Sequence, residues 1–114
     1  MNLNKLVTEL DKNAISFKEV MQVIDENYDF TPCSFKNGDT FNEANTNNGS
    51  CKVFAFGQLN HLSQQATLNA FGDFYTKDVL QNPNGDDHQN IRNFMKTGWQ
   101  GIQFEGSPLK QKEI

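Results

Sequence analysis

The segment Ser50-Cys-Lys-Val-Phe-Ala-Phe-Gly-Gln-Leu-Asn-His61 decides the fold that this chain can adopt. Ser50 is a candidate N-cap, and a helix over Cys51–His61 would be apolar on almost every face. A helix of this kind usually lies at the centre of a domain, with all its faces buried. A buried strand over residues 52–56 is the alternative, because a short apolar run has no diagnostic period. We expect the helix, with its phenylalanines at the centre of the core.

Two amphipathic helices are predicted before this segment. Apolar residues recur at helical spacing over Leu3–Leu10, which predicts a first helix with one core-facing stripe. Ser16 and Glu19 then match a capping box, in which the serine oxygen accepts a backbone N–H and the glutamate reaches back. The apolar residues behind this box share one face as far as Tyr28. We therefore expect a second helix that begins after Ser16.

A fourth helix is predicted after the central one. Ser63 is its candidate N-cap, and its apolar face continues to about Leu80. Gly72 falls on this face. Glycine in a helix interior costs about 1 kcal/mol relative to alanine, so we expect close packing at Gly72 to compensate.

A fifth helix is predicted after the turn at residues 82–85. Either Asp86 or Asp87 would cap it, because both precede its first apolar residue. It would run through Met95, which we expect to face inward. Gly98 is a natural stop.

The remaining segments predict a small β element. They are an extended run at Phe30–Phe35, a turn at residues 36–39, a strand at Thr40–Phe41, a loop at Asn42–Gly49 and a strand at Gly101–Glu105. Residues 110–114 predict a loose tail. The fold class that follows is a mainly helical α+β domain over residues 1–114, with about five helices around the Phe-rich central helix.

Composition argues against several classes of function. The 114 residues include 14 acidic and 10 basic side chains, for a net charge of −4, and the basic residues are not clustered. Nucleic-acid binding and membrane binding through a basic helix both need such clusters, so neither is expected. The N-terminus lacks the apolar region of a secretory signal peptide, and no segment is long enough to span a bilayer. We expect a cytoplasmic protein with reduced thiols.

The sharpest candidate site is Asp86-Asp-His-Gln-Asn-Ile-Arg92, at the predicted start of the fifth helix. Free N–H groups and the helix dipole favour an anion or polarise a carbonyl at such a position. His88 would act there as an acid or base, oriented by Asp87. Asn90 and Arg92 follow within about one turn. The structural alternative is that an aspartate caps the helix while the other side chains make ordinary hydrogen bonds.

Cys51 is a second candidate, because it lies at a predicted helix start beside Lys52. Both features lower the pKa of a thiol, and a nearby His88 or His61 would complete a nucleophile–base pair. The alternative role of Cys51 is that of a small buried apolar side chain. The sequence leaves open whether Cys51 pairs with Cys33. No metal-ligand spacing is present, so neither a metal nor another cofactor is expected.

Trp99 is the candidate interaction surface. It stands between Gly98 and Gly101, in a part of the chain rich in aromatic residues. Aromatic residues in this region either fill the core or line a groove. An exposed tryptophan would favour a surface that binds another protein.

The run Gly72-Asp-Phe-Tyr-Thr-Lys-Asp-Val-Leu-Gln-Asn-Pro-Asn-Gly-Asp-Asp-His-Gln-Asn-Ile-Arg-Asn-Phe-Met-Lys-Thr-Gly-Trp99 resembles the HopJ type III effector family of small bacterial proteins. Further matching segments are Phe30-Thr-Pro32, Phe35-Lys-Asn-Gly38, Asn48-Gly-Ser-Cys-Lys52, Phe54-Ala-Phe56 and Phe104-Glu-Gly-Ser-Pro-Leu109. The resemblance extends from about residue 17 to residue 109, with the segments in the same order.

The resemblance implies a bacterial protein with a link to type III secretion, and it transfers no catalytic residues. It favours a binding module with an unknown protein partner, which would be a host protein for a secreted effector. The alternative is a small enzyme or ligand-binding protein that uses Asp87, His88 and Arg92. Cys51 would be a further group in that site. The helix predicted at Leu3–Leu10 differs from the flexible, polar start of type III signals, so we expect the bacterial cytoplasm, and the N-terminal sequence does not support secretion.

Overall fold

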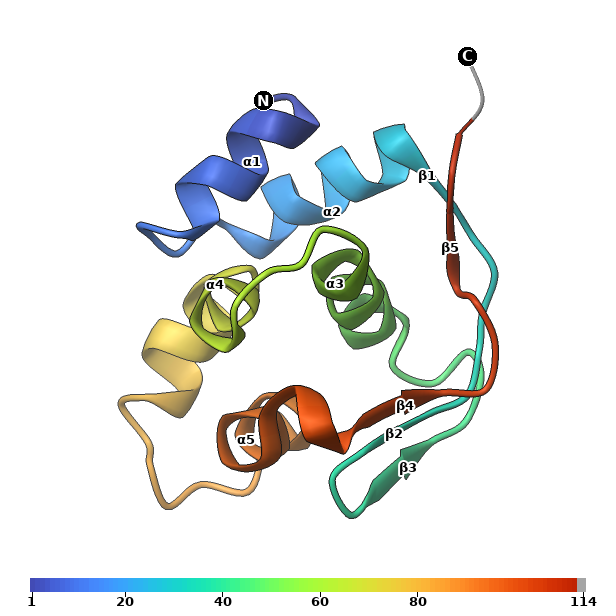
Figure 1. The fold of residues 1–114 in the computed structure, drawn as a ribbon. Helices are drawn as coiled ribbons and strands as arrows, with labels where there is room; N and C mark the ends of the chain where they lie inside the picture. Colours follow the sequence, from blue (N-terminus) through green and yellow to red (C-terminus); the bar gives the residue numbers. More distant parts are fainter. Residues whose placement is uncertain (113–114) are drawn as a thin grey trace.

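The helix α3 (Asn48–Leu59) runs through the middle of the molecule, with helices on three sides and strands on the fourth (Figure 1). The computed structural model describes residues 1–112. The other elements are α1 (Leu3–Leu10), α2 (Phe17–Asn27), β1 (Tyr28–Phe30), β2 (Phe35–Asn37), β3 (Thr40–Asn42), α4 (Gln64–Asn69), the π-helix η1 (Phe74–Val79), α5 (Gln89–Thr97), the 3₁₀-helix η2 (Gly98–Gly101), β4 (Ile102–Phe104) and β5 (Leu109–Gln111). The mainly helical α+β class is therefore confirmed.

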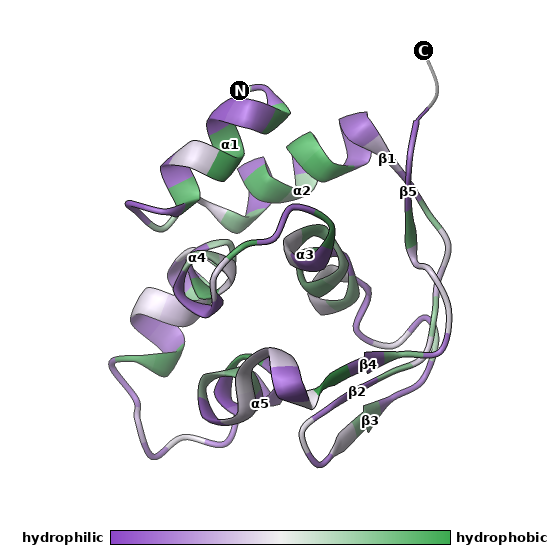
Figure 2. Ribbon diagram, in the orientation of Figure 1, coloured by the Kyte–Doolittle hydropathy of each residue, from purple (hydrophilic) through white to green (hydrophobic). Residues whose placement is uncertain are grey.

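The core is built around the phenylalanines of α3, as the sequence predicts. The Phe54 ring is fully buried, and its centroid lies 6.0 Å from that of Phe35 in β2. The centroids of Phe71 and Phe94 lie 5.6 Å and 5.0 Å from that of Phe54. In Figure 2 apolar residues recur along α2, α3 and β4, whereas the turns are mostly hydrophilic. A single aromatic side chain thus links the sheet, the α4–η1 region and α5.

The start of α3 differs from the prediction. The helix begins at Asn48, with Asn47 in the N-cap position, so Ser50 lies in its first turn and is not the cap. The predicted loop is also shorter than expected, because Asn42 belongs to β3. The Asn47 amide donates to Asn42 Oδ1 over 2.6 Å, and this contact holds the short connection between strand and helix.

The two N-terminal helices agree with the prediction. The helix α1 has the predicted bounds, and α2 begins directly after Ser16. The Ser16 hydroxyl accepts the Glu19 backbone N–H over 3.2 Å, as in a capping box. The helix α2 ends at Asn27, and Tyr28 opens the first strand with its side chain still buried.

The predicted fourth helix is divided in two at Gly72. The helix α4 ends at Asn69 and η1 begins at Phe74, and between them Gly72 has φ +59°. A Cβ at Gly72 would lie 2.6 Å from the Ile15 carbonyl oxygen and 2.9 Å from the Phe17 backbone nitrogen. The prediction of one continuous fourth helix is therefore wrong. The close approach expected at Gly72 is present, but it is made to the α1–α2 connection and not to a helix.

The start of α5 corrects the predicted cap. The helix begins at Gln89, and His88 takes the N-cap position in the left-handed region, with φ +49°. Neither Asp86 nor Asp87 caps it. The Asp87 carboxylate instead accepts a hydrogen bond from Arg92 over 2.7 Å, which takes its side chain away from the helix N–H groups.

The end of α5 agrees with the prediction in one respect and differs in another. Gly98 has φ +58°, and its N–H donates to the Phe94 carbonyl, so the glycine stop is confirmed. Phe94 is fully buried, whereas Met95 is 37% exposed. Because consecutive residues lie about 100° apart round a helix, Met95 points away from the core that Phe94 enters.

The strands form two small antiparallel sheets. One has the order β3-β2-β4. The turn predicted at residues 36–39 is confined to residues 38–39, because Lys36 and Asn37 belong to β2. In the other, β5 pairs with β1, and Lys110 lies opposite Asp29. The prediction of a loose tail is therefore wrong for Lys110 and Gln111, which belong to β5. Leu109 is 5% exposed and anchors β5 in the core, while residues 113–114 of the predicted tail lie outside the described residues.

We expect Gly72→Ala to lower the free energy of unfolding by on the order of 3 kcal/mol, because alanine is strained at positive φ and its Cβ would meet backbone atoms. Gly106→Ala is the matched control, since its Cβ would meet only Cys33 Sγ, at 3.6 Å. Urea denaturation of the two variants measures the difference. Equal stabilities would contradict the strain assigned to Gly72.

Candidate functional site

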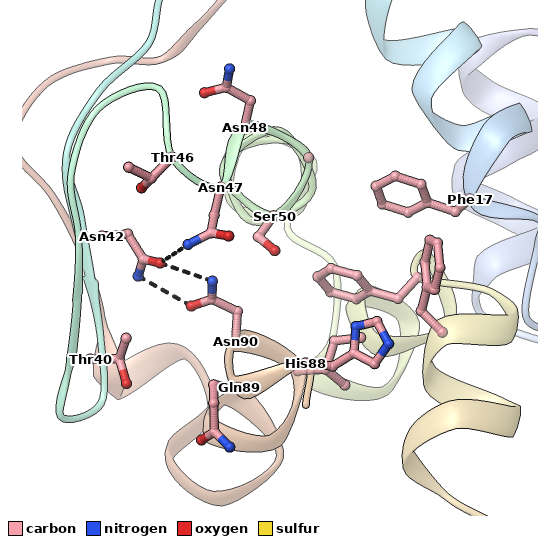
Figure 3. Close-up of a pocket in the computed structure, with 14 residues that line it drawn as sticks. Phe17, Thr40, Asn42, Thr46, Asn47, Asn48, Ser50, His88, Gln89 and Asn90 are labelled. Atoms are coloured by element: carbon pink, nitrogen blue, oxygen red, sulfur yellow. Dashed lines mark hydrogen bonds between the residues drawn. The ribbon is translucent and has the colours of Figure 1, made fainter. Parts of the chain in front are cut away.

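A cleft of about 480 Å³ lies where the first turns of α2, α3 and α5 meet (Figure 3). The strand β3 with the loop that follows it forms one side, and the α4–η1 connection forms the other. Its lining residues are Phe17, Thr40, Asn42, Thr46, Asn47, Asn48, Gly49, Ser50, Phe71, Phe74, His88, Gln89, Asn90 and Ile91. Two of the residues predicted as a site, His88 and Asn90, are among them.

The polar side of the cleft is a set of mutually bonded amides. Asn90 Nδ2 donates to Asn42 Oδ1 over 3.0 Å, and Asn42 Nδ2 donates back to Asn90 Oδ1 over 3.2 Å. Asn47 Nδ2 donates to the same Asn42 oxygen over 2.6 Å. Figure 3 shows these three amides meeting between β3, α3 and α5. The two-way pair fixes the orientation of both amide planes.

The amides continue behind the cleft into the core. Asn37 Nδ2 donates to the Asn90 carbonyl oxygen over 2.8 Å and to Asn90 Oδ1 over 3.0 Å. Asn37 is fully buried, and its Oδ1 has no hydrogen-bond partner among the residues that the structure describes. We call Asn37, Asn42, Asn47 and Asn90 the amide network. It joins the β2–β3 hairpin to α5 and to the start of α3.

The opposite side of the cleft is aromatic and consists of Phe17, Phe71 and Phe74, which we call the aromatic wall. The Phe17 ring stacks with that of Phe71 at 6.2 Å and meets that of Phe74 edge to face at 5.2 Å. Phe74 is 40% exposed, and its ring lies 5.3 Å from the His88 imidazole. The cleft therefore has one amide side and one apolar side.

Two helix starts line the cleft, and in the described structure neither has a side-chain cap. They are residues 48–50 of α3 and residues 89–91 of α5. The Asn47 amide bonds Asn42 instead of the helix, and the His88 side chain turns to Asp78. The Ile91 N–H donates to the His88 carbonyl over 3.0 Å. First-turn N–H groups without such a bond carry partial positive charge and can donate to an oxygen atom of a ligand.

His88 lines the cleft and is held by carboxylates. Its Nε2 lies 3.1 Å from Asp78 Oδ2 and 3.9 Å from Asp87 Oδ2. Asp87 was the predicted orienting group, but Asp78 is the closer of the two. Asp78 is the last residue but one of η1 and lies ten residues before His88 in the sequence, so no local pattern links the two.

Arg92 lies outside the cleft and holds the turn that precedes α5. Its Nε donates to the Asp87 carbonyl over 2.6 Å, its Nη1 to the Asn82 carbonyl over 2.9 Å and its Nη2 to Asp87 Oδ1 over 2.7 Å. The hydrogen bond from Arg92 lowers the pKa of the Asp87 carboxyl below its ordinary value. The guanidinium is thus engaged in closing a turn, in agreement with the structural alternative for this residue.

Cys51 is buried and lies apart from the lining residues of the cleft. It is 2% exposed, and burial raises the pKa of its thiol to about 11. Its Sγ lies 3.8 Å from the Cys33 carbonyl oxygen, but both cysteines are free thiols, so the two do not pair. Burial outweighs the effect of the helix start and of Lys52, which instead bonds Asp25 over 2.8 Å.

Trp99 is half-buried beside the core. Its indole N–H donates to the Leu62 carbonyl over 3.0 Å, and its ring meets Phe94 edge to face at 5.0 Å. A Cβ at Gly57 would lie 2.8 Å from the Trp99 ring, so the indole lies directly against α3. These contacts give Trp99 a packing role, and its use as an interaction surface stays a prediction.

The structure therefore divides the predicted site residues. It brings His88 and Asn90 to the cleft, while Asp87 and Arg92 form a clamp beside it and Cys51 lies in the core. Sequence reasoning missed Asn42, Asn47 and Phe17 as parts of one site, and it considered Ser50 only as a helix cap. Phe74 belongs to the aromatic-rich region that the sequence predicts either to fill the core or to line a groove, and it does line the cleft. The dense asparagines of residues 42–48 were the available signal, and we interpreted them only as a loop.

The described residues also limit other kinds of site. Within residues 1–112, no three His, Cys, Asp or Glu side chains are grouped so that they could hold a metal ion. No helix in that range has the length and apolar content needed to cross a membrane.

The fold and the cleft define a small, mainly helical α+β domain with a single central helix. A solved structure shares this architecture: the crystal structure of a protein of unknown function, VPA0580, superposes with a TM-score of 0.95. The two sequences are 57% identical, and the match covers 98% of this chain and 95% of that one. No match was found among curated proteins.

The family model described as HopJ type III effector protein matches residues 3–109. The match covers nearly the whole chain, so the chain belongs to the HopJ family. The resemblance inferred from the Gly72–Trp99 run is therefore confirmed.

We expect only one thiol to react with a disulfide reagent in the native protein at pH 8. With a pKa of about 11, Cys51 holds little thiolate at that pH, and its burial blocks access. Its labelling should be about 100-fold slower in the native protein than in urea. Cys33→Ser and Cys51→Ser variants assign the two rates. A fast native reaction at Cys51 would restore it as a candidate nucleophile.

Proposed function

We propose that this HopJ protein is a binding module whose recognition site is the cleft between the amide network and the aromatic wall. The observation that carries the proposal is the two-sided lining of that cleft, in which preorganised amides face a partly exposed ring. Pockets with an apolar surface and a few fixed polar groups are the usual form of ligand sites.

The division of the predicted site residues favours binding over catalysis. An enzyme built on Asp87, His88, Arg92 and Cys51 needs these groups within reach of one substrate. Of the four, only His88 lines the cleft, and the Cys51 thiol is protonated at neutral pH. His88 and Asp78 together form a pair that could move a proton, so a hydrolytic role for this pair is the alternative to test if binding is found.

Membership in the HopJ family also supports a second, separate proposal, that the protein acts on a partner in a host cell after type III secretion. The family description carries this link. The partner would then be a host protein or a group attached to one. A secretion signal at the N-terminus of this chain would include the helix α1.

We expect Thr46→Trp to block binding in the cleft. Thr46 lines the cleft and is exposed, so an indole there would fill the entrance without entering the core. An NMR screen of uncharged and charged fragments, read from the backbone amides, should give ligands that shift cleft residues and bind the variant at least about tenfold more weakly. Thr31→Trp, at an exposed site outside the cleft, is the control. Ligands that shift only other surfaces would overturn the proposal.

We expect residues 1–50 fused to a reporter enzyme to be exported by a strain with a working type III system if the effector proposal holds. The matched control is the same fusion in a strain that lacks the secretion ATPase. Equal reporter levels outside both strains, or none outside either, would remove the effector proposal and leave the binding proposal unaffected.

A further inference from the structure

We propose that the occupant of the cleft is a neutral sugar ring, with its hydroxyls on the amide side and a C–H face on the aromatic wall. The inference rests on the proposed binding function and names the chemical class of its ligand. Three features of the lining carry it: its lack of charge, its supply of groups that both donate and accept, and its partly exposed aromatic ring.

His88 is the one ionisable side chain among the lining residues, and its Nε2 lies 3.1 Å from Asp78 Oδ2. Charged residues make up 21% of the sequence, yet no Asp, Glu, Lys or Arg lines the cleft. A charged ligand would lose its hydration on entry, and none of these four residue types lines the cleft to pair with it. The first-turn N–H groups of α3 and α5 can donate to a hydroxyl or ring oxygen as they can to an anion, so phosphate is the competing ligand that the test must include.

The polar side offers the mixture of donors and acceptors that hydroxyls need. The Ser50 hydroxyl has no hydrogen bond to any other residue in the range 1–112, and it can donate and accept. Asn47 uses one N–H on Asn42, which leaves its other N–H and its Oδ1 for a ligand. A sugar hydroxyl also donates and accepts, so it can bond the Ser50 hydroxyl in either sense, accept from the free Asn47 N–H and donate to Asn47 Oδ1.

The aromatic wall offers a fixed ring for the other face of the sugar. Phe74 is 40% exposed, and the rings of Phe17 and His88 hold it at 5.2 Å and 5.3 Å. The face of an aromatic ring carries negative charge, so it attracts the weakly positive C–H groups of a pyranose face. An amphipathic ring of this kind can use both sides of the cleft at once.

The test is a titration of the ¹⁵N-labelled full chain, followed by its backbone amide shifts. The neutral probes are glucose, N-acetylglucosamine and maltose, and the charged probes are glucose 6-phosphate and inorganic phosphate. An uncharged capped dipeptide, N-acetyl-Ala-Phe-amide, tests a peptide as the occupant, and a glycosylated form of the same peptide tests a sugar presented by a protein.

We expect saturable shifts at Asn42, Ser50 and Asn90 with at least one neutral sugar. Ser50→Ala should weaken this binding about fivefold and Phe74→Leu about tenfold, since each removes contacts to one side of the ligand. Ser107→Ala, an exposed serine outside the cleft, should leave the affinity unchanged.

The outcomes separate this inference from the function on which it rests. Cleft shifts with the bare dipeptide or with phosphate, and none with the sugars, would overturn the sugar and keep the binding module. Sugar binding that Ser50→Ala and Phe74→Leu leave unchanged would also overturn it. No cleft shift with any probe, together with a fragment screen that finds no ligand for the cleft, would overturn both.

Discussion

Hydrogen bonds between buried amides join the β2–β3 hairpin to α5 at Asn90, and the cleft depends on this contact. Asn90 enters the space behind the β2–β3 hairpin, where it bonds Asn37 and Asn42 across about fifty residues of sequence. A buried amide left unpaired costs on the order of 1–3 kcal/mol, so these bonds stabilise the position of α5 against the hairpin. Residues of β3 and of α5 both line the cleft, so its shape depends on this contact.

The helix α5 is also held by an aromatic contact. Four residues after Asn90, Phe94 packs against Phe54 of the central helix, so one turn of α5 is held by amides and the next by rings. Both contacts lie on one face, because residues four apart are neighbours on a helix. The position of α5 relative to α3 is thus doubly determined, and the first turns of the two helices are fixed on either side of the cleft. The lining of the cleft is therefore ordered before a ligand binds, which lowers the entropy cost of binding.

The sequence predicts well the features that depend on a few neighbouring residues. The Ser16 cap, the Gly98 stop and the apolar centre of α3 follow from local chemistry and are all present. The predictions are wrong where a residue distant in sequence changes the local structure. Gly72 breaks a helix because the α1–α2 connection lies against it, and Asp87 leaves the helix start because Arg92 binds it. In the site, His88 and Asn90 were found by their place at a helix start, but the amide network was not, since asparagines in sequence mostly indicate turns.

Stability alone would favour a different start for both helices at the cleft. A serine, threonine, aspartate or asparagine cap is worth about 1 kcal/mol, and candidates for it stand at Asn47 and Asp87. Asn47 bonds Asn42 and Asp87 bonds Arg92, while His88 adopts a left-handed backbone that costs a residue with a Cβ roughly 1 kcal/mol or more. Natural sequences depart from such local rules mainly at functional sites. Here the two uncapped α-helix starts line the same cleft, and this supports placing recognition there.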